Sequence, residues 1–363
     1  MRVLQVVNSM ATGGAEKLLL ETIPLYAEKE IKMDVLVLDG KDYPFMIKLK
    51  SLNCCEIHSL NLSSVYSPMA IFKIIPFLKK YDIVHIHLFP AQYWVVLAKI
   101  ASFSKVKLVF TEHSTSNRRI QNKVFGILDR FIYSYYVKII CITSQVKSVL
   151  KNHISLNEKV FEVIENGVPI IKFKNAQALP KNDFFEGNDL KLIIQVSSFQ
   201  EPKDQKTVIE SLQFLPENVK LLLVGEGHLK YDSENLVEAL KLKGRVNFLG
   251  QRMDVPNLLK TADIIVLSSK YEGLSLSSIE GMATGKPFIA SDVPGLTDVI
   301  KDAGILFSKG NAKELSQRIQ ELLGNEDYYK SVAKKCENRA ENYNIDKMIN
   351  SHLKLYKRIY EHK

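Results

Sequence analysis

Residues 263–285 of this chain read DIIVLSSKYEGLSLSSIEGMATG. The run Asp263–Leu267 is short, nearly continuously apolar and rich in β-branched residues, which is typical of a strand buried on both faces of a parallel sheet. Residues 268–276 then form the loop at the carboxyl end of that strand, where open α/β sheets place their ligands. A helix follows, so the segment predicts a strand–loop–helix unit with a binding site at its turn.

Two carboxylates, Glu272 and Glu280, bracket this turn. Ser277 and Glu280 fit the capping-box pattern, so we expect the helix to begin near Ser277 and to close at Gly285. The first amide groups of such a helix favour an anion such as a diphosphate, and Gly273 lets the backbone approach it closely. The carboxylates would accept hydrogen bonds from hydroxyl groups. A capping box alone also explains Glu280, and a solvated loop position remains an alternative for Glu272.

Strands and helices alternate along both halves of the chain. The apolar β-type runs occupy residues 3–7, 34–38, 83–86, 108–110, 139–142 and 160–164, and then 192–196, 220–224, 246–249, 264–267 and 287–290. Between the halves, residues 170–190 lose this pattern and contain Pro180 and Gly187, which indicates a linker. The pattern predicts two Rossmann-like domains.

Length and composition narrow the class of protein and its expected cellular compartment. The 363 residues suffice for two domains with separate cores. No apolar run approaches the roughly 18 residues of a membrane span, and residues 1–7 are typical of a first strand rather than of a signal peptide. The four cysteines show neither metal-binding spacing nor a disulfide framework, which favours a reducing cytoplasm.

The formal net charge of +9 is unevenly distributed. Lys and Arg exceed Asp and Glu in residues 1–173 and 345–363, whereas residues 174–344 are slightly acidic. The basic side predicts an anionic partner, either a membrane surface or a polyprenyl-diphosphate carrier. Residues 68–80 and 118–136 mix apolar and basic side chains as interfacial helices do, although crossover helices are amphipathic in any such domain. No nucleic-acid-binding motif accompanies the charge, so nucleic acid is not expected as a partner.

An ordered set of motifs runs through nearly the whole chain. It consists of Gly13-Gly14-Ala15-Glu16, Thr111-Glu112-His113, Glu165-Asn166-Gly167-Val168-Pro169, Lys203-Asp204-Gln205, Gly225-Glu226-Gly227, Asp254-Val255-Pro256, Glu272-Gly273-Leu274-Ser275, Glu280-Gly281-Met282-Ala283, Gly285-Lys286-Pro287 and Pro294-Gly295. In this order the motifs resemble those of the retaining glycosyltransferases of family 4, which have the GT-B fold. The resemblance implies an α/β architecture of two Rossmann-like domains facing across a cleft. Residues 1–173 would form the acceptor domain and 174–344 the nucleotide-sugar donor domain, with a C-terminal helix in 345–363 crossing back to the first.

The resemblance also implies the reaction and its residues. A hexosyl group would pass, with retention, from a UDP- or GDP-linked sugar to a glycan or lipid-linked saccharide in cell-surface polysaccharide or lipopolysaccharide biosynthesis, at the inner face of the cytoplasmic membrane. The implied catalytic residues are His113, Glu272 and Lys203. The implied donor-binding residues are Gly13, Gly14, Ser198, Met253, Gly273, Leu274, Ser275 and Glu280. Neither a metal nor a cofactor is expected, because the nucleotide diphosphate sugar is a co-substrate and its charge would fall to Lys203 and helix termini.

Ser198 departs from the family pattern, since many members carry an Arg a few residues before the Lys that corresponds to Lys203. A serine donates a hydrogen bond without supplying charge. More of the diphosphate charge would then fall to Lys203 and the helix of Glu280, or to another cation such as Arg252. His85 and His87 share one strand face, but two ligands without a third are poor support for a metal. A nucleotide-sugar epimerase and a non-catalytic sugar-nucleotide binding protein remain alternatives. A dinucleotide oxidoreductase is disfavoured because neither half carries G-x-G-x-x-G.

Overall fold

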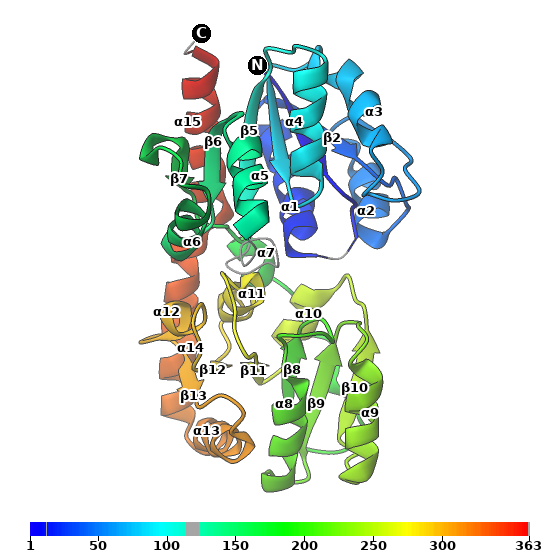
Figure 1. Cartoon of the computed structure of the whole chain (residues 1–363). Coiled ribbons are helices and arrows are strands. Elements are labelled where there is room, and N and C mark those ends of the chain that lie inside the picture. Colours follow the sequence, from blue (N-terminus) through cyan, green and yellow to red (C-terminus); the bar gives the residue numbers. More distant parts are fainter. Residues whose placement is uncertain (12, 114–122, 362–363) are drawn as a thin grey trace. The chain divides into compact units, whose positions relative to one another are not determined.

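The computed structural model describes residues 1–11, 13–113 and 123–361, which fold into two α/β units (Figure 1). Unit 1 comprises Met1–Gly167 and Ile345–Lys363, and unit 2 comprises Val168–Asn344. This boundary lies earlier in the chain than the expected one after residue 173. The reason is that Ile170 and Phe173 are buried in the hydrophobic core of unit 2.

Unit 1 is built on a seven-stranded parallel sheet with the strand order β3-β2-β1-β4-β5-β6-β7. Its strands are β1 (Arg2–Val7), β2 (Lys32–Val37), β3 (Ile57–Ser59), β4 (Ile83–His87), β5 (Lys107–Glu112), β6 (Tyr136–Cys141) and β7 (Phe161–Val163). Its helices are α1 (Gly14–Glu28), α2 (Pro44–Leu52), α3 (Met69–Leu78), α4 (Ala91–Ala101), α5 (Lys123–Tyr133), α6 (Ser144–Ile154) and α15 (Ile345–Glu361). The strand order reverses between β1 and β4, and open sheets bind ligands at such a switch point.

Unit 2 has a six-stranded parallel sheet with the order β10-β9-β8-β11-β12-β13. Its strands are β8 (Lys191–Val196), β9 (Val219–Val224), β10 (Val246–Gly250), β11 (Ile264–Leu267), β12 (Phe288–Ser291) and β13 (Ile305–Phe307). Its helices are α7 (Ile170–Lys174), α8 (Gln205–Ser211), α9 (Lys230–Ala239), α10 (Val255–Thr261), α11 (Leu276–Ala283), α12 (Thr297–Ile300), α13 (Ala312–Gly324) and α14 (Glu326–Ala340). Here the strand order reverses between β8 and β11.

The last helix, α15, returns to the first domain as the family resemblance implied. Its apolar face is buried in the core of unit 1 with the side chains of β1, β2 and α1, and includes Met348, Ile349, Leu355 and Tyr356. Amphipathic periodicity explains this, because apolar residues three or four positions apart fall on one face of a helix. The helix therefore belongs to the core of the domain that begins the chain.

Each apolar run expected as a strand coincides with or overlaps a strand of the structure. The short edge strands β3 and β13 were not predicted, whereas β7, which also has three residues, was. The expected linker contains α7. Arg118 and Arg119 of the expected interfacial stretch lie outside the described residues. Within the described ranges, no helix is both long enough and apolar enough to cross a membrane.

Candidate active site

In unit 2 the loops that follow β8 and β11 are joined at the switch point. Residues 197–204 form the first loop and residues 268–275 the second. Two backbone hydrogen bonds connect them, from Asp204 N to Ser268 O at 3.1 Å and from Lys270 N to Pro202 O at 2.8 Å. The adjacency of β8 and β11 in the sheet thus brings Lys203 and Glu272 together, although 68 residues separate them in the sequence.

Lys203 and Glu272 form an ion pair between Nζ and Oε1. Their side chains are 16% and 11% exposed, so the pair is largely shielded from water. Shielding strengthens the attraction between the charges and also makes either charge costly to leave alone. Two of the three expected catalytic residues therefore meet, and each neutralises the other.

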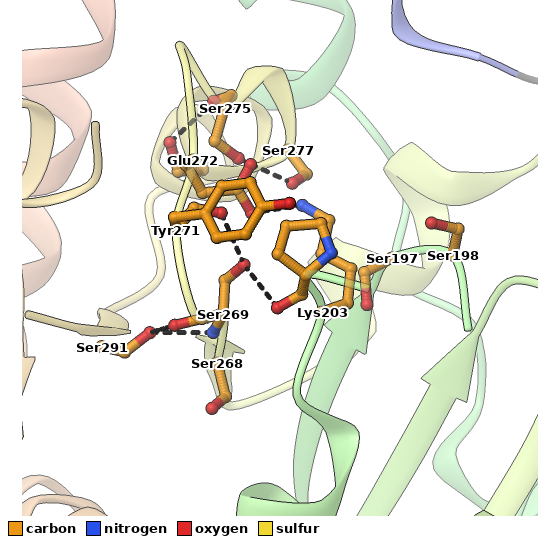
Figure 2. A network of polar contacts seen from close by, with 12 residues as sticks. Ser197, Ser198, Lys203, Ser268, Ser269, Tyr271, Glu272, Ser275, Ser277 and Ser291 are labelled. Atoms are coloured by element: carbon orange, nitrogen blue, oxygen red, sulfur yellow. Dashed lines mark hydrogen bonds and ion pairs between the residues drawn. The ribbon is translucent and has the colours of Figure 1, made fainter. Parts of the chain in front are cut away.

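Serine hydroxyl groups fix the loop that carries Glu272 (Figure 2). Ser269 Oγ lies within hydrogen-bonding distance of two carbonyl oxygens, those of Pro202 at 3.2 Å and Tyr271 at 3.1 Å. Ser291, at the end of β12, donates its hydroxyl group to Ser269 O and accepts a bond from Ser269 N, both at 2.8 Å. The loop is held from β12 as well as from the β8 loop, so the position of Glu272 does not depend on its ion pair alone.

Helix α11 begins one residue earlier than expected and has no capping box. Ser275 is the N-cap residue, and its hydroxyl group contacts Ser277 Oγ at 3.1 Å rather than a backbone amide. Glu280 lies in the interior of the helix with a side chain that is buried, the residue being 3% exposed. The capping explanation for Glu280 is therefore wrong. Gly285 follows the C-cap with φ 72°, which confirms the expected end of the helix.

Close backbone contacts at two glycines shape the site, and sequence reasoning assigned neither a role. Gly295 has φ 84°, and a Cβ atom there would lie 2.2 Å from Gly273 O and 2.3 Å from Glu272 O. Gly225 has φ 140°, and a Cβ atom would lie 2.1 Å from Ser197 O. Only glycine permits such approach. The signal was present in the sequence as Gly225-Glu226-Gly227 and Pro294-Gly295, but a motif does not reveal which loop it contacts.

The other expected donor residues lie on loops at the same edge of the sheet. Ser198 follows β8, its carbonyl oxygen accepts a 2.9 Å bond from Gln205 Nε2, and its side chain stands apart from the contacts drawn in Figure 2. Met253, after β10, has an exposed side chain. Arg252 donates to Asp254 at 2.8 and 2.6 Å, and this pairing lowers the pKa of Asp254. The cation considered as a substitute for the missing Arg is thus already paired with a carboxylate.

In unit 1, Gly13 and Gly14 stand at the start of α1, as predicted. Gly13 is the N-cap residue, and a Cβ atom on it would lie 2.2 Å from Glu16 Oε2, whereas one on Gly14 would meet nothing within 4 Å. Glu16 is buried, and burial raises the pKa of its carboxyl group. Gly13 therefore makes room for a carboxyl group beside the first turn, and Gly14 leaves its own side of the turn open.

His113 follows β5 and contacts a histidine of the neighbouring strand. Its Nε2 lies 3.1 Å from Nδ1 of His87. Burial lowers the pKa of His113 to about 4, so the ring is neutral at pH 7. His85 also hydrogen-bonds protein side chains, Tyr356 at 2.6 Å and Thr111 at 2.7 Å. His85 and His87 thus serve a polar network of the core.

Among the described residues, Asp34, Glu56 and His58 are close enough together to bind a metal ion. They lie in another part of unit 1, on or beside β2 and β3. The hydroxyl group of Tyr81 already bonds Asp34 at 2.8 Å and His58 at 3.2 Å. This cluster is explained by its own hydrogen bonds and contributes nothing to the site at Glu272.

Residues 176–343 match the family model of glycosyl transferases group 1, and residues 12–171 match that of Glycosyltransferase Family 4. The chain is 27% identical over 318 residues to the Escherichia coli UDP-Gal:alpha-D-GlcNAc-diphosphoundecaprenol alpha-1,3-galactosyltransferase, covering 82% of this chain and 81% of the relative.

Two solved structures share the fold. Anabaena HepE in complex with UDP and glucose superimposes with a TM-score of 0.84 at 18% identity, covering 98% of this chain and 99% of HepE. WaaG, a glycosyltransferase involved in lipopolysaccharide biosynthesis, gives a TM-score of 0.71 at 18% identity, covering 96% and 98%. Both are GT-B proteins, so the two parallel sheets of this chain are those of the GT-B fold.

Proposed function

Because the chain belongs to the family 4, group 1 glycosyltransferases, we propose that it moves a hexosyl group from a nucleotide diphosphate sugar to a hydroxyl group of a lipid-linked saccharide, with retention at the anomeric carbon. The observation that carries this proposal is the shielded Lys203–Glu272 pair at the switch point of unit 2. It supplies a cation for a leaving diphosphate and an acceptor for sugar hydroxyl groups in one place.

In the proposed reaction the bond between the anomeric carbon and the diphosphate oxygen breaks, and the acceptor oxygen forms a bond on the same face. The acceptor proton passes to the departing phosphate oxygen. Lys203 and the first amides of α1 and α11 stabilise the charge that grows on the diphosphate. Glu272 and His113 orient the sugar, and Glu280 holds the ribose. These groups need neither a metal ion nor a cofactor for charge stabilisation.

For the donor, we favour a UDP-linked sugar over a GDP-linked one. The Escherichia coli relative uses UDP-Gal by its name, and HepE was solved with UDP. A thermal-shift panel of UDP, GDP and ADP with their sugars tests the base, since a ligand at a hundred times its Kd stabilises the folded state by about 2.7 kcal/mol. Stabilisation by GDP and not by UDP would overturn this choice.

For the acceptor, we propose a polyprenyl-diphosphate-linked saccharide reached at the inner face of the cytoplasmic membrane. The named Escherichia coli relative acts on a diphosphoundecaprenol-linked sugar. In unit 1, α5 exposes Ile127, Leu128 and Phe131, and α3 exposes Met69 and Phe72. Lys79 and Lys80 follow α3, and the acidic residue of α5, Asp129, is buried. Apolar side chains beside basic ones are what an anionic membrane surface binds.

Vesicle binding tests this surface. Phe131→Glu in α5 should reduce sedimentation with phosphatidylglycerol vesicles, and neutral phosphatidylcholine vesicles should bind less of the unmodified protein. Phe214→Glu in unit 2 is the matched control, because the two phenylalanines are 50% and 48% exposed. Equal binding of both variants to anionic vesicles would contradict the assignment of the membrane surface to α5.

Transfer itself is tested with UDP-sugars and a membrane extract as the source of acceptor. Glu272→Ala and Lys203→Ala should abolish acceptor-dependent release of UDP. Lys270→Ala should not, since Lys270 lies on the same loop but pairs with Glu201 in an exposed ion pair of 2.7 Å. Product formed without acceptor would indicate an epimerase, and nucleotide binding without release would indicate a binding protein. The anomeric configuration of the product, read by NMR, decides retention.

A further inference from the structure

A chain of buried hydrogen bonds runs inward from His113 into the core of unit 1. His113 Nε2 lies 3.1 Å from His87 Nδ1, and His87 Nε2 lies 2.8 Å from Gln5 Oε1. The amide nitrogen of Gln5 donates to the hydroxyl group of Tyr356 at 3.3 Å and to Met33 Sδ at 3.2 Å. Gln5 and His87 are 2% and 4% exposed, and the network therefore has few alternatives to these partners.

The side-chain amide of Gln5 determines which group donates and which accepts in each of these hydrogen bonds. Met33 Sδ accepts hydrogen bonds and donates none, so the amide nitrogen of Gln5 faces it and the carbonyl oxygen faces His87. A carbonyl oxygen accepts, so His87 must carry its proton on Nε2. Burial lowers the pKa of His87 well below its ordinary value, so the ring is neutral and its Nδ1 holds a lone pair.

The position of the proton on the His113 ring follows from the protonation of His87. Because His87 Nδ1 is an acceptor, His113 must donate to it from Nε2. The His113 ring is neutral at pH 7, since burial lowers its pKa to about 4. A neutral imidazole carries one proton, which places the lone pair of His113 on Nδ1.

We infer that Gln5 and His87 are positioning residues that hold the proton of His113 on Nε2 and leave Nδ1 to accept a hydrogen bond from a hydroxyl group of the transferred sugar. This inference rests on the proposed function for the contact between His113 and the sugar. The tautomer itself rests only on the hydrogen bonds of unit 1. Gln5 and His87 act through His113, and neither touches the substrate.

The tautomer is measured directly on the unmodified protein. Two-dimensional NMR of ring-labelled histidine at pH 7.5 distinguishes a protonated from an unprotonated ring nitrogen, with His113→Asn assigning the signal. We expect His113 with Nε2 protonated and Nδ1 bare. A proton on Nδ1 would overturn the inference whether or not the protein transfers sugar.

Kinetics then tests the use of Nδ1. An Asn side chain reaches about where Nδ1 lies and a Gln side chain about where Nε2 lies, so His113→Asn should retain more of kcat than His113→Gln. Gln5→Leu should lower kcat about ten-fold, as expected for weakening one substrate hydrogen bond, with little change in KM for the donor. The matched control is His153→Gln, because the His153 side chain is 6% exposed in the same unit and bonds Asp129 at 2.8 Å rather than any member of this network.

These outcomes test the positioning role of Gln5 and His87 separately from the proposed function. If the kcat of His113→Gln exceeded that of His113→Asn, or if Gln5→Leu had no more effect on kcat than His153→Gln, the positioning role would be wrong even though transfer continued. If no variant or unmodified protein transferred sugar while NMR still placed the proton on Nε2, the proposed function would fail and the tautomer would stand.

Discussion

Replacing Glu272 by Gln should have opposite effects on nucleotide binding and on sugar transfer. Glu272 holds the ammonium group of Lys203 in an ion pair. A diphosphate that binds Lys203 must draw it away from, or share it with, this carboxylate. Glu272→Gln keeps the size of the side chain and removes the competing charge. We therefore expect tighter binding of UDP alone, together with loss of transfer, because a neutral amide orients the sugar hydroxyl groups less strongly.

The magnitude follows from the shielding of the pair. Two charges about 4 Å apart attract by about 4 kcal/mol at an effective dielectric constant of 20, and desolvation offsets most of this. Exposed pairs retain about 0.2–1 kcal/mol, and with side chains 16% and 11% exposed this pair should lie at or slightly above that range. About 1 kcal/mol corresponds to roughly five-fold tighter binding of UDP. Loss of a charged hydrogen bond to the sugar should lower kcat/KM about a hundred-fold.

Isothermal titration of UDP into unmodified, Glu272→Gln and Lys203→Met proteins provides the assay. Lys203→Met should weaken UDP binding, whereas Glu272→Gln should strengthen it, and the gain should shrink as salt is added. Lys270→Met controls for a lost lysine on the same loop. If Glu272→Gln weakened UDP binding as much as Lys203→Met, the carboxylate would not compete with the nucleotide and the reasoning would be refuted.

Three further results are expected. Gly295→Ala should destabilise unit 2 by about 1–3 kcal/mol and reduce transfer, because its Cβ atom would strike the backbone of Glu272. The control is Gly310→Ala, since Gly310 has φ 76° and its Cβ atom would meet nothing within 4 Å. This variant should lose less free energy of unfolding in urea and leave transfer intact. Ser198→Arg should tighten UDP binding and steepen its salt dependence in titrations; no change would mean that position 198 lies away from the diphosphate. Burial lowers the pKa of His352 to about 4, so between about pH 4 and 6.5 the unfolded chain binds more protons than the folded protein does. The free energy of unfolding should therefore fall as the pH drops through this window, by up to about 1.4 kcal/mol per pH unit for this residue. His352→Gln should flatten that slope in unfolding measured at pH 5 and 8.

The sequence predicted the sheets better than it predicted the site. Runs such as Leu192–Val196 are so apolar that only a strand buried on both faces accommodates them, and β8 lies there. The order of strands is a different matter. That β8 pairs with β11, which joins Lys203 to Glu272, depends on contacts between segments far apart in sequence and was not predicted. The family resemblance assigned both residues to the site without giving this pairing.

Local rules failed where tertiary contacts compete with them. Ser277 and Glu280 have the spacing of a capping box, yet the helix begins at Leu276 and Glu280 is buried. The pattern describes an isolated helix end, whereas here Ser275 is the N-cap residue and its hydroxyl group contacts Ser277 Oγ. The buried polar chain through Gln5 and His87 left no pattern either, because it joins separate strands at single positions.

Charge pairing gives the departure at Ser198 a physical meaning. In unit 2 two basic side chains on the loops near the expected diphosphate position already hold carboxylates: Lys203 with Glu272 and Arg252 with Asp254. An Arg at position 198 would add a cation to this balance, and the serine leaves it neutral. A diphosphate entering such a site gains little from net charge. Its stabilisation must come from exchanging Glu272 for phosphate at Lys203 and from the fixed dipoles of helix amides, which cost no reorganisation when charge develops. Because these charges balance, the position of the diphosphate against Lys203 and the helix amides contributes more to its stabilisation than long-range attraction by net charge does.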